Sequence, residues 1–554
     1  MSKNRLIYLP LGGAGEIGMN CYVYGYGPKG RERFIIVDLG VTFPDMGYTP
    51  GVDLILPDIE WIEERRERLD GIFITHAHED HVGAVGHLWP RLKAPVHARA
   101  FTAHIARLKF EERGHDELQI RTAPAFPEMV EAGPFKVGFV PISHSIPESS
   151  ALVIETPAGR IVHSGDFKLD RTPGVGEPYD PDLWAEVAAP GVRALVCDST
   201  NVFSPRPGRS EKSVRPEIEK LVAGARGMVA ATTFASNIAR VRTLAEAGHK
   251  AGRSVVLLGR AMRRMITAAV ETGILHDFPK VISPEEAAQM PREKVMLLST
   301  GSQGEHRAAT AALARGKYMG LSMQEGDLFL FSSKTIPGNE VSVARIVNQF
   351  SEMGVEVVDD EDGRYHVSGH ANRPDLAEFH RIVAPQFLIP MHGEHRHLRA
   401  HVALGEECGI AGIIAPNGAM VELTGKAPRI VEHVETGRTY VDGHVQIGAL
   451  DGVVRERLRM AQNGHVLVTL ILEDDEPLGE AWCEIMGLAE TGISRSPVAE
   501  VLEEDVTQFL MRAGRKTLAD DERLEEEIRK IVRRTSQEEL GKKPEVTVVI
   551  SRLS

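Results

Sequence analysis

The segment 71–83 constrains this chain most, and it reads Gly-Ile-Phe-Ile-Thr-His-Ala-His-Glu-Asp-His-Val-Gly. Its apolar and β-branched run ends abruptly at His76, as if a buried strand presented polar side chains at its carboxyl end. Side chains two apart share one face of an extended chain, so His76 and His78 can bind one cation. Asp80 and His81, just past the strand, can turn toward a second cation.

The residue types in this segment indicate the metal. Imidazole nitrogens and carboxylate oxygens suit Zn²⁺, with Mn²⁺ as a second choice. Three histidines and one aspartate within six residues depart far from ordinary composition, which disfavours a polar loop with chance histidines. The pattern His-x-His-x-Asp-His resembles the signature of the metallo-β-lactamase fold, a scaffold of metal-dependent hydrolases. The pattern is specific for that fold and not for a substrate.

The composition is that of a globular chain. Its 554 residues, 42% of them hydrophobic, can bury several domain cores. No cysteine pair has Cys-x-x-Cys spacing, the sequence opens on no apolar signal segment, and no stretch has the length of a membrane span. We therefore expect a reduced, cytoplasmic protein with no membrane association.

Charge alone argues against a nucleic-acid partner. The net charge is −14, whereas phosphate binding requires a basic surface. However, acidic residues concentrate toward the C-terminus, at 473–476 and 520–527, and arginines concentrate elsewhere. Global charge is therefore a weak guide for this chain.

A glycine cluster near the start imitates a dinucleotide-binding motif. Gly13-Ala-Gly15-Glu-Ile-Gly18 fits the pattern G-x-G-x-x-G, and Asp38 follows Gly18 at the distance such a fold requires. The helix is missing from the pattern, because glycines and a proline interrupt residues 20–33. We predict a strand, a glycine-rich turn and two further strands, with Asp38 supporting the metal ligands from behind.

Short apolar runs alternate with helical segments after residue 190, which is typical of an α/β domain with a parallel sheet. The segments Phe234-Ala-Ser-Asn237 and Thr300-Gly-Ser-Gln-Gly-Glu305 follow two of these runs. Backbone donors at the starts of helices, with arginines nearby, form anion sites. We expect such sites here.

Two late histidine motifs extend the resemblance. Tyr365-His-Val-Ser-Gly-His370 and Met391-His-Gly-Glu394 resemble those of the β-CASP subgroup, the nucleic-acid-processing members of the fold, and Asp198 stands at its early acidic motif. Together with residues 12–20 and the two anion-site segments, these motifs make the chain closely similar to the bacterial ribonuclease J family over residues 5–550.

The resemblance implies an α/β fold, namely a metallo-β-lactamase αββα sandwich with an inserted α/β β-CASP domain and a small C-terminal α/β domain. We expect the sandwich at 1–205 and 351–449, the β-CASP domain at 206–350, a linker at 450–464 and the C-terminal domain at 465–554. The C-terminal domain has no ligand-like cluster, so we assign it to assembly. The family implies a homodimer, and possible homotetramers.

The resemblance also completes the ligand set. His144 and Asp166 each follow an apolar run, at the places of the third histidine and the bridging aspartate of the fold. One Zn²⁺ would take His76, His78 and His144, and Asp166 would bridge to the second. The second Zn²⁺ would take Asp80, His81 and His392.

Three further expectations concern residues outside the ligand set. His370 would donate a hydrogen bond or a proton to the substrate, with Asp198 orienting its ring, so both act in catalysis together with Asp80. His395, His397 and His401, on a helix beyond His392, are expected to be exposed. By resemblance, a structural Ca²⁺ would lie at Gly51, Asp53 and Asp451, although unrelated surface carboxylates explain these residues as well.

Two cations can lower the pKa of a shared water and offset the charge of a pentavalent phosphorane, so the predicted reaction is phosphodiester hydrolysis. The resemblance implies endonucleolytic cutting and 5′-to-3′ trimming of single-stranded RNA, in RNA maturation and decay, with RNA-degradation proteins as possible partners. Hydrolysis of a small molecule such as a lactam or thioester is one alternative, and a non-catalytic RNA-binding scaffold is another. The complete ligand set disfavours the scaffold, and the long arginine-bearing insertion disfavours a small substrate.

Exonuclease action requires a pocket that holds the terminal nucleotide at a fixed distance from the metals. A closed pocket that fits a monophosphate leaves little room for a triphosphate, so we expect a preference for 5′-monophosphate ends. The candidates for this pocket are Ala235, Ser236, Asn237, His366, Val367, Ser368, Gly369 and His370.

Overall fold

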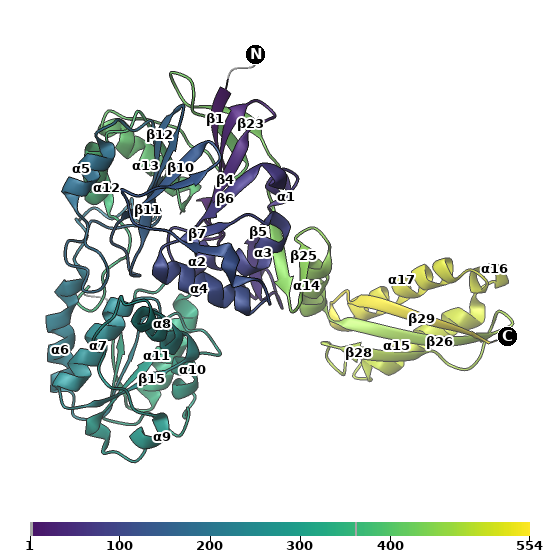
Figure 1. Ribbon diagram of the computed structural model, residues 1–554. Helices are drawn as coiled ribbons and strands as arrows, with labels where there is room; N and C mark the ends of the chain where they lie inside the picture. The colour runs from purple at the N-terminus through teal and green to yellow at the C-terminus, as the bar shows by residue number, and fades with distance from the viewer. Residues whose placement is uncertain (1–3, 361–362, 554) are drawn as a thin grey trace. The chain divides into compact units, whose positions relative to one another are not determined.

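The computed structural model describes residues 4–360 and 363–553 (Figure 1). The chain forms two compact units. The first comprises Met1–Thr42 and Leu56–Gly437, and the second comprises Phe43–Ile55 and Arg438–Ser554. A short segment near the N-terminus thus belongs to the C-terminal unit, which no local sequence pattern indicates.

The first sheet of the large unit has eight strands, in the order β23-β22-β1-β3-β4-β6-β7-β8. Its strands are β1 (Asn4–Gly12), β3 (Cys21–Pro28), β4 (Arg33–Val37), β6 (Leu69–Phe73), β7 (Val96–Ala98), β8 (Ile120–Thr122), β22 (Ala419–Glu422) and β23 (Arg429–His433). Strands β1, β3 and β4 are antiparallel neighbours, and β6 adds in parallel to β4. The predicted strand, turn, strand and strand at the N-terminus are confirmed. Among the described residues, no helix lies between the glycine cluster and the end of β4.

The second sheet has seven strands, in the order β21-β19-β13-β12-β11-β10-β9. Its strands are β9 (Val130–Ala132), β10 (Phe135–Pro141), β11 (Ser150–Thr156), β12 (Gly159–His163), β13 (Ala194–Asp198), β19 (Phe387–Met391) and β21 (Ala411–Gly412). Large side chains of the two sheets, such as Tyr22 and Phe73 from one and Phe139 from the other, share one buried core. The sheets therefore pack face to face.

Helices cover the outer faces. On the second sheet, α5 (Pro181–Ala188), α12 (Arg373–Val383) and α13 (His395–Glu407) bury a core that includes Trp184 and Phe379. On the first sheet, α4 (Ala100–Glu111) packs beside β7 and β8, and α3 (Val85–Leu92) packs against α4. This arrangement confirms the predicted αββα sandwich.

The register of the parallel strands positions the site. His163 at the end of β12 pairs with Val196 of β13, and Asp198 at the end of β13 pairs with Met391 of β19. The residues that follow these strands therefore emerge at one edge of the sheet, where sites of α/β sheets form. Asp166 and His392 are among them.

The inserted domain has a five-stranded parallel sheet, in the order β15-β16-β14-β17-β18. Its strands are β14 (Val229–Thr232), β15 (Ser254–Leu258), β16 (Val295–Ser299), β17 (Leu328–Phe331) and β18 (Glu356–Val358), with helices that include α6 (Arg215–Gly224), α7 (Ile238–Lys250), α8 (Arg260–Glu271) and α11 (Glu340–Glu352). The parallel sheet agrees with the predicted α/β insert. Its last strand comes from beyond residue 350, the expected end of the insert.

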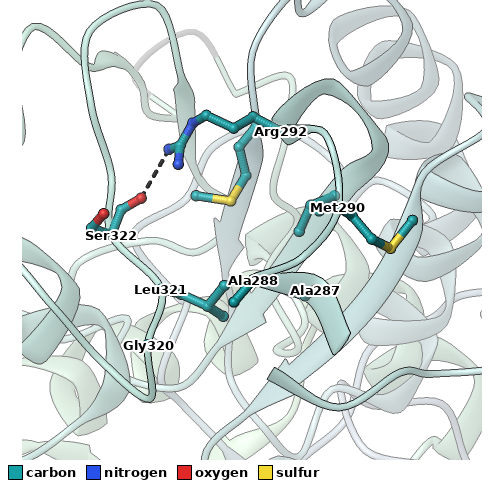
Figure 2. A pocket seen from close by; sticks show the side chains of 9 residues that line it. Ala287, Ala288, Met290, Arg292, Gly320, Leu321 and Ser322 are labelled. Carbon is teal, nitrogen blue, oxygen red and sulfur yellow. Dashed lines mark hydrogen bonds between the residues drawn. The ribbon is translucent and has the colours of Figure 1, made fainter. Parts of the chain in front are cut away.

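A small cavity lies in this insert, between Met290, Arg292, Leu321 and their neighbours (Figure 2). Arg292 closes one side by donating a hydrogen bond to the carbonyl of Ser322, at 2.8 Å. The cavity volume is about 100 Å³. Ligand pockets measure about 300 Å³ or more, so this cavity is too small for a nucleotide.

Strand β5 (Leu54–Pro57), whose first two residues belong to the second unit, lies in one sheet with β24 (Arg438–Asp442) and β25 (Val445–Gly448). The region expected to be a linker, 450–464, contains α14 (Val453–Asn463). Strands β26 (His465–Glu473), β28 (Trp482–Met486) and β29 (Glu545–Leu553) then form a sheet, and α15 (Val498–Arg512) and α17 (Asp521–Leu540) share its core. Among the described residues, no helix is long and apolar enough to cross a membrane.

Candidate metal centre

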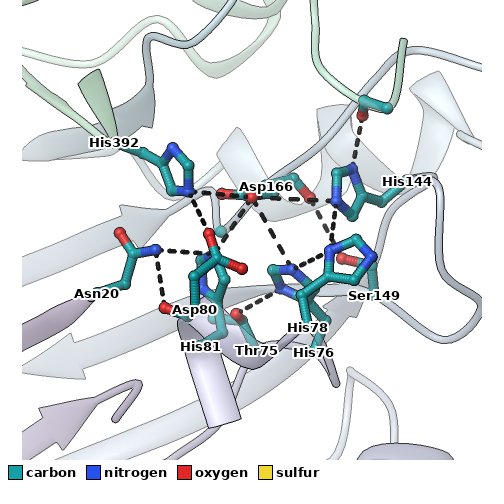
Figure 3. Close-up of polar contacts among 12 residues, drawn as sticks. Asn20, Thr75, His76, His78, Asp80, His81, His144, Ser149, Asp166 and His392 are labelled. Carbon is teal, nitrogen blue, oxygen red and sulfur yellow. Dashed lines mark hydrogen bonds and ion pairs between the residues drawn. The ribbon is translucent and has the colours of Figure 1, made fainter. Parts of the chain in front are cut away.

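The structure brings all seven predicted ligands together in two groups that share Asp166 (Figure 3). Within each group, the potential ligand atoms lie within 4.8 Å of one another. The first group is His76, His78, His144 and Asp166, and the second is Asp80, His81, His392 and Asp166. The segment after β6 supplies four of the seven, and the ends of β10, β12 and β19 supply one each.

The first group has the spacing of a coordination shell. Nδ1 of His78 lies 3.1 Å from Nε2 of His76 and 3.1 Å from Nε2 of His144. Oδ2 of Asp166 lies 3.9 Å from Nε2 of both His76 and His144. Tetrahedral ligands around Zn²⁺ are separated by about 3.4 Å, given metal–nitrogen bonds of about 2.1 Å. These four atoms therefore fit one cation.

The second group has similar spacing. Oδ2 of Asp80 lies 3.1 Å from Nε2 of His392 and 3.7 Å from Nε2 of His81. Oδ2 of Asp166 lies 3.2 Å from His81 Nε2 and 3.3 Å from His392 Nε2. Oδ1 of Asp166 is buried and has no hydrogen-bond partner among the described residues. A buried carboxylate with an unpaired oxygen and two donor sets beside it is the arrangement that a bridging ligand requires.

Outer hydrogen bonds fix which ring nitrogen faces the cluster. His144 Nδ1 donates to the carbonyl of Gly369 at 2.6 Å, and His81 Nδ1 donates to Oδ2 of Asp38 at 2.7 Å. The hydroxyl of Thr75 donates to Asp38, so it accepts from His76 Nδ1 at 2.9 Å. In each neutral ring, Nε2 then carries the lone pair that can bind a metal.

His392 follows the same rule through Thr200. The Thr200 hydroxyl donates to Oδ1 of Asp198 at 2.7 Å, and it accepts from His392 Nδ1 at 2.9 Å. Asp38, a predicted supporting carboxylate, and Thr75 and Thr200, which we do not predict, are thus the residues that hold the rings. Thr75 directly precedes His76, and Thr200 lies two residues after Asp198. This closeness to predicted site residues is the signal that could have identified the two threonines.

The electrostatics of the first group favour ligand histidines. Burial lowers the pKa of His76 and His144 well below the usual value, and it lowers the pKa of His78 to about 4. These rings are therefore neutral near pH 7. Neutral imidazole is the form that binds a metal.

Carboxylates dominate the second group. Burial alone would lower the pKa of His392, but Asp166 and Asp80 raise it to about 9. Burial alone would raise the pKa of Asp166, but His392 and His81 hold it well below its usual range. The carboxylates of the second group thus favour positive charge. A divalent metal ion would displace the protons from His81 and His392.

His370 lies beside the two groups without belonging to either. Its Nδ1 donates to Oδ2 of Asp198 at 2.7 Å and lies 4.0 Å from Oδ2 of Asp166. Burial alone would lower the pKa of His370, but Asp198 raises it above the usual value. Because the Nδ1–H group donates its hydrogen bond to Asp198, Nε2 is the ring nitrogen that can act on a substrate.

Both segments expected to hold the terminal nucleotide border the first group. Ser236 Oγ lies 3.1 Å from Nε2 of His78, and Gly369 accepts from His144. Asn237 is buried and caps α7, accepting from the amide of Arg240. The remaining residues surround these contacts, with Ala235 half-buried, Val367 buried, His366 half-buried and Ser368 bonded to Asn201.

The residues expected to hold a structural cation each contact another group. Asp53 accepts a hydrogen bond from the amide of Gly443 at 2.8 Å, and Asp451 accepts from that of Gly448 at 2.6 Å. Gly443 lies in the turn before β25, and Gly448 is the last residue of that strand. The Arg457 side chain, a cation itself, lies against Gly51.

The expectation of exposed histidines on α13 is wrong for two of three. His395 is exposed, whereas His397 and His401 are buried. His401 faces α12, where its Nε2 lies 3.0 Å from Nε2 of His380, and its Nδ1 donates to Ser199 at 2.9 Å. The polar sequence of α13 therefore includes a buried face. Cys197, His380 and His401 form a further buried group of possible ligands.

Comparisons with known proteins agree with this geometry. Family models match at residues 15–222 (Metallo-beta-lactamase superfamily), 226–350 (Ribonuclease J, beta-CASP domain), 363–416 (Zn-dependent metallo-hydrolase RNA specificity domain) and 452–553 (Ribonuclease J C-terminal domain). The protein named Ribonuclease J from Sinorhizobium meliloti is 41% identical over 99% of this chain and 98% of its own length. This chain belongs to the ribonuclease J family.

Other members of the family align over similar lengths. The Ribonuclease J of Mycolicibacterium smegmatis is 35% identical, over 98% of this chain and 96% of its own. Ribonuclease J 1 of Streptococcus pyogenes is 35% identical, over 85% of this chain and 84% of its own. Membership confirms the family resemblance, the fold and the prediction of an enzyme of the nuclease hydrolase class.

Proposed function

We propose that this protein is a two-metal ribonuclease that hydrolyses phosphodiester bonds of single-stranded RNA, both at internal sites and from 5′ ends that carry a monophosphate. The observation that carries the proposal is the pair of donor sets that meet at Oδ2 of Asp166, with the His370–Asp198 pair beside them. The donors suit two Zn²⁺ ions, and Mn²⁺ as a replacement.

The roles of the side chains follow from their contacts. When bound, two divalent cations lower the pKa of a water and offset charge on the phosphate. Asp166 would hold the two donor sets together, and Asp80 would complete the second. His370, oriented by Asp198 at 2.7 Å, would donate a proton to the leaving oxygen through Nε2.

The preference for a monophosphate rests on the start of α7. Ser236 immediately precedes the helix cap at Asn237, so its hydroxyl and the positive end of a thirteen-residue helix can attract a terminal phosphate. The loop 366–370 contacts His144 through the carbonyl of Gly369, and it would close the pocket. A pocket bounded on both sides limits the number of phosphates that fit.

Incubation with labelled RNA tests the reaction class. We expect hydrolysis of RNA that depends on a divalent metal, and no opening of a chromogenic β-lactam. Faster degradation of 5′-monophosphate RNA than of 5′-triphosphate RNA supports the pocket, and equal rates contradict it. Hydrolysis of the lactam with no hydrolysis of RNA would replace this proposal with the small-molecule alternative.

Substitution of Ser236 separates the two activities. Ser236→Ala should slow the attack on 5′-monophosphate ends and leave internal cutting unchanged, because internal cutting does not use the terminal phosphate. Ser322→Ala, in the same domain but at the small cavity, is the matched control. An equal loss of both activities in Ser236→Ala contradicts a role in binding the 5′ end.

The second unit is proposed to mediate assembly as a homodimer or homotetramer. Ile471, Trp482 and Met486 are exposed on its sheet, and apolar residues on an open sheet face are suited to a subunit interface. Deletion of 450–554 should lower the number of subunits per particle, which light scattering gives as the measured mass divided by the mass of the truncated chain, while metal content is retained. A truncated protein with the same number of subunits as the parent contradicts this role. A cytoplasmic location, action in RNA maturation and decay, and partners among RNA-degradation proteins stay predictions.

A further inference from the structure

Phe203 presents an aromatic ring near the metal centre. It lies in the loop after β13, five residues beyond Asp198, and 54% of its surface is exposed. Single exposed apolar residues are common and need no explanation by themselves. Phe203 differs from such residues in what surrounds it and in how it is held.

Two side chains of α13 flank the ring. The ring of His397 lies 5.1 Å from that of Phe203, between centroids, and the guanidinium carbon of Arg396 lies 5.8 Å from the Phe203 centroid. Arg396 is itself held by Glu394, with Nε donating to the carboxylate at 2.8 Å. The Phe203 ring thus has a cation next to it that Glu394 holds in place. Sites that stack nucleobases combine an aromatic ring and a cation in the same way.

The three residues that precede Phe203 anchor the loop that carries it. Thr200 bonds Asp198 and His392, and Asn201 donates to Ser368 at 2.7 Å. Val202 is fully buried, and its amide closes a turn onto the carbonyl of Ser199 at 3.1 Å. The backbone on which the ring stands is therefore ordered before any ligand arrives, which lowers the entropic cost of binding.

The ring also lies close to the predicted chemistry. Only two residues separate Phe203 from Thr200, so their Cα atoms lie at most about 11 Å apart. Thr200 touches the ligand His392. Arg396 and His397 both fall within residues 363–416, the part that matches the metallo-hydrolase RNA specificity model.

We propose that Phe203, with Arg396 beside it, is a stacking platform for one base of the RNA close to the scissile phosphate. The inference rests on the proposed ribonuclease function. Stacking on an aromatic ring tolerates any base, since every base has a π-face, so the platform would hold the strand without selecting sequence. Phe203 is a positioning residue, because it touches the substrate away from the reacting atoms.

The test compares Phe203→Ala and Phe203→Trp in the full-length protein. Phe203→Ala should weaken the binding of a phosphorothioate RNA, which resists hydrolysis, by about 5- to 100-fold. It should raise KM for ordinary RNA by a similar factor and leave kcat and metal content unchanged. Phe203→Trp should bind as well as the parent or better. Leu118→Ala, at an 84% exposed leucine of the same unit, is the control and should change nothing.

Fluorescence locates the stacked base. With 2-aminopurine placed at successive positions, the parent and Phe203→Trp should quench one position near the 5′ end strongly, and Phe203→Ala should not. Unchanged affinity and quenching in Phe203→Ala overturn the platform. So does a Phe203→Trp variant that loses affinity as Phe203→Ala does. A parent that binds RNA but never cleaves it contradicts the proposed function, and the binding comparison still decides the platform.

Discussion

The buried ion pair of Arg240 offers the sharpest test of how the insert is joined to the site. Arg240 on α7 is fully buried, and its Nε and Nη2 donate to the two carboxylate oxygens of Glu211 at 2.6 and 3.0 Å. Its Nη1 donates to the carbonyls of Ser332, at 3.0 Å, and Tyr365, at 2.7 Å. The bond to Tyr365 holds the residue that directly precedes the loop 366–370.

Arg240→Met would remove these four bonds and a fifth, from Nη1 to Oγ of Ser332 at 3.0 Å. Removing one partner of a buried ion pair costs about 3–5 kcal/mol, because the other charge stays buried and unpaired. Two carbonyls that lose a donor add about 1 kcal/mol each. The sum, about 5–7 kcal/mol, is comparable to the whole stability of many domains. Arg240→Met combined with Glu211→Leu removes the stranded charge and should recover roughly half of the loss.

Native-state hydrogen exchange is the suitable assay, since a chain of several domains does not unfold in one step. Amides of β14 and β17 should exchange much faster in Arg240→Met than in the parent, and the double variant should lie between them. Arg226→Met, at an exposed arginine of the same domain, is the control. Equal protection in Arg240→Met and the parent, or less protection in the double variant than in the single one, would refute the reasoning.

The remaining predictions concern the centre and its support. His76→Ala and Asp80→Ala should abolish hydrolysis and lower bound metal, and unchanged metal content by elemental analysis would contradict their assignment as ligands. His370→Ala should keep its metals and lose about 10²-fold in rate, as expected for loss of acid catalysis, so loss of metal would refute the assignment. Burial alone would raise the pKa of Asp170. Lys168, at 3.0 Å, and two backbone amides lower this pKa by more than burial raises it, so the net pKa lies below the usual value. Its contribution to stability should therefore be present above about pH 4 and disappear as pH falls below that value, so the difference in Tm between the parent and Asp170→Asn should shrink at low pH.

The clustering of the seven candidate ligands was predictable in part from local signals. At His76, Asp166 and His392 a side chain of a metal-binding type follows an apolar run. The same logic identified the strands of the insert and of the C-terminal unit. The family resemblance supplied the expected roles of His144, Asp166 and His392.

What sequence could not supply depends on contacts between distant segments. The burial of His401 follows from the packing of α13 on α12, since His380 and Ser199 supply hydrogen-bond partners for the buried ring. Residues 43–55 join the C-terminal unit through β5, and β18 joins the insert across residues that carry no periodic pattern. Local propensity does not report such pairings.

Anomalous X-ray scattering from crystals grown with Zn²⁺ tests the central claim most directly. The account predicts two peaks, one within bonding distance of His76, His78 and His144, the other of Asp80, His81 and His392, with Asp166 contacting both. A single peak at full occupancy, or zinc bound away from Asp166, would contradict a two-metal centre.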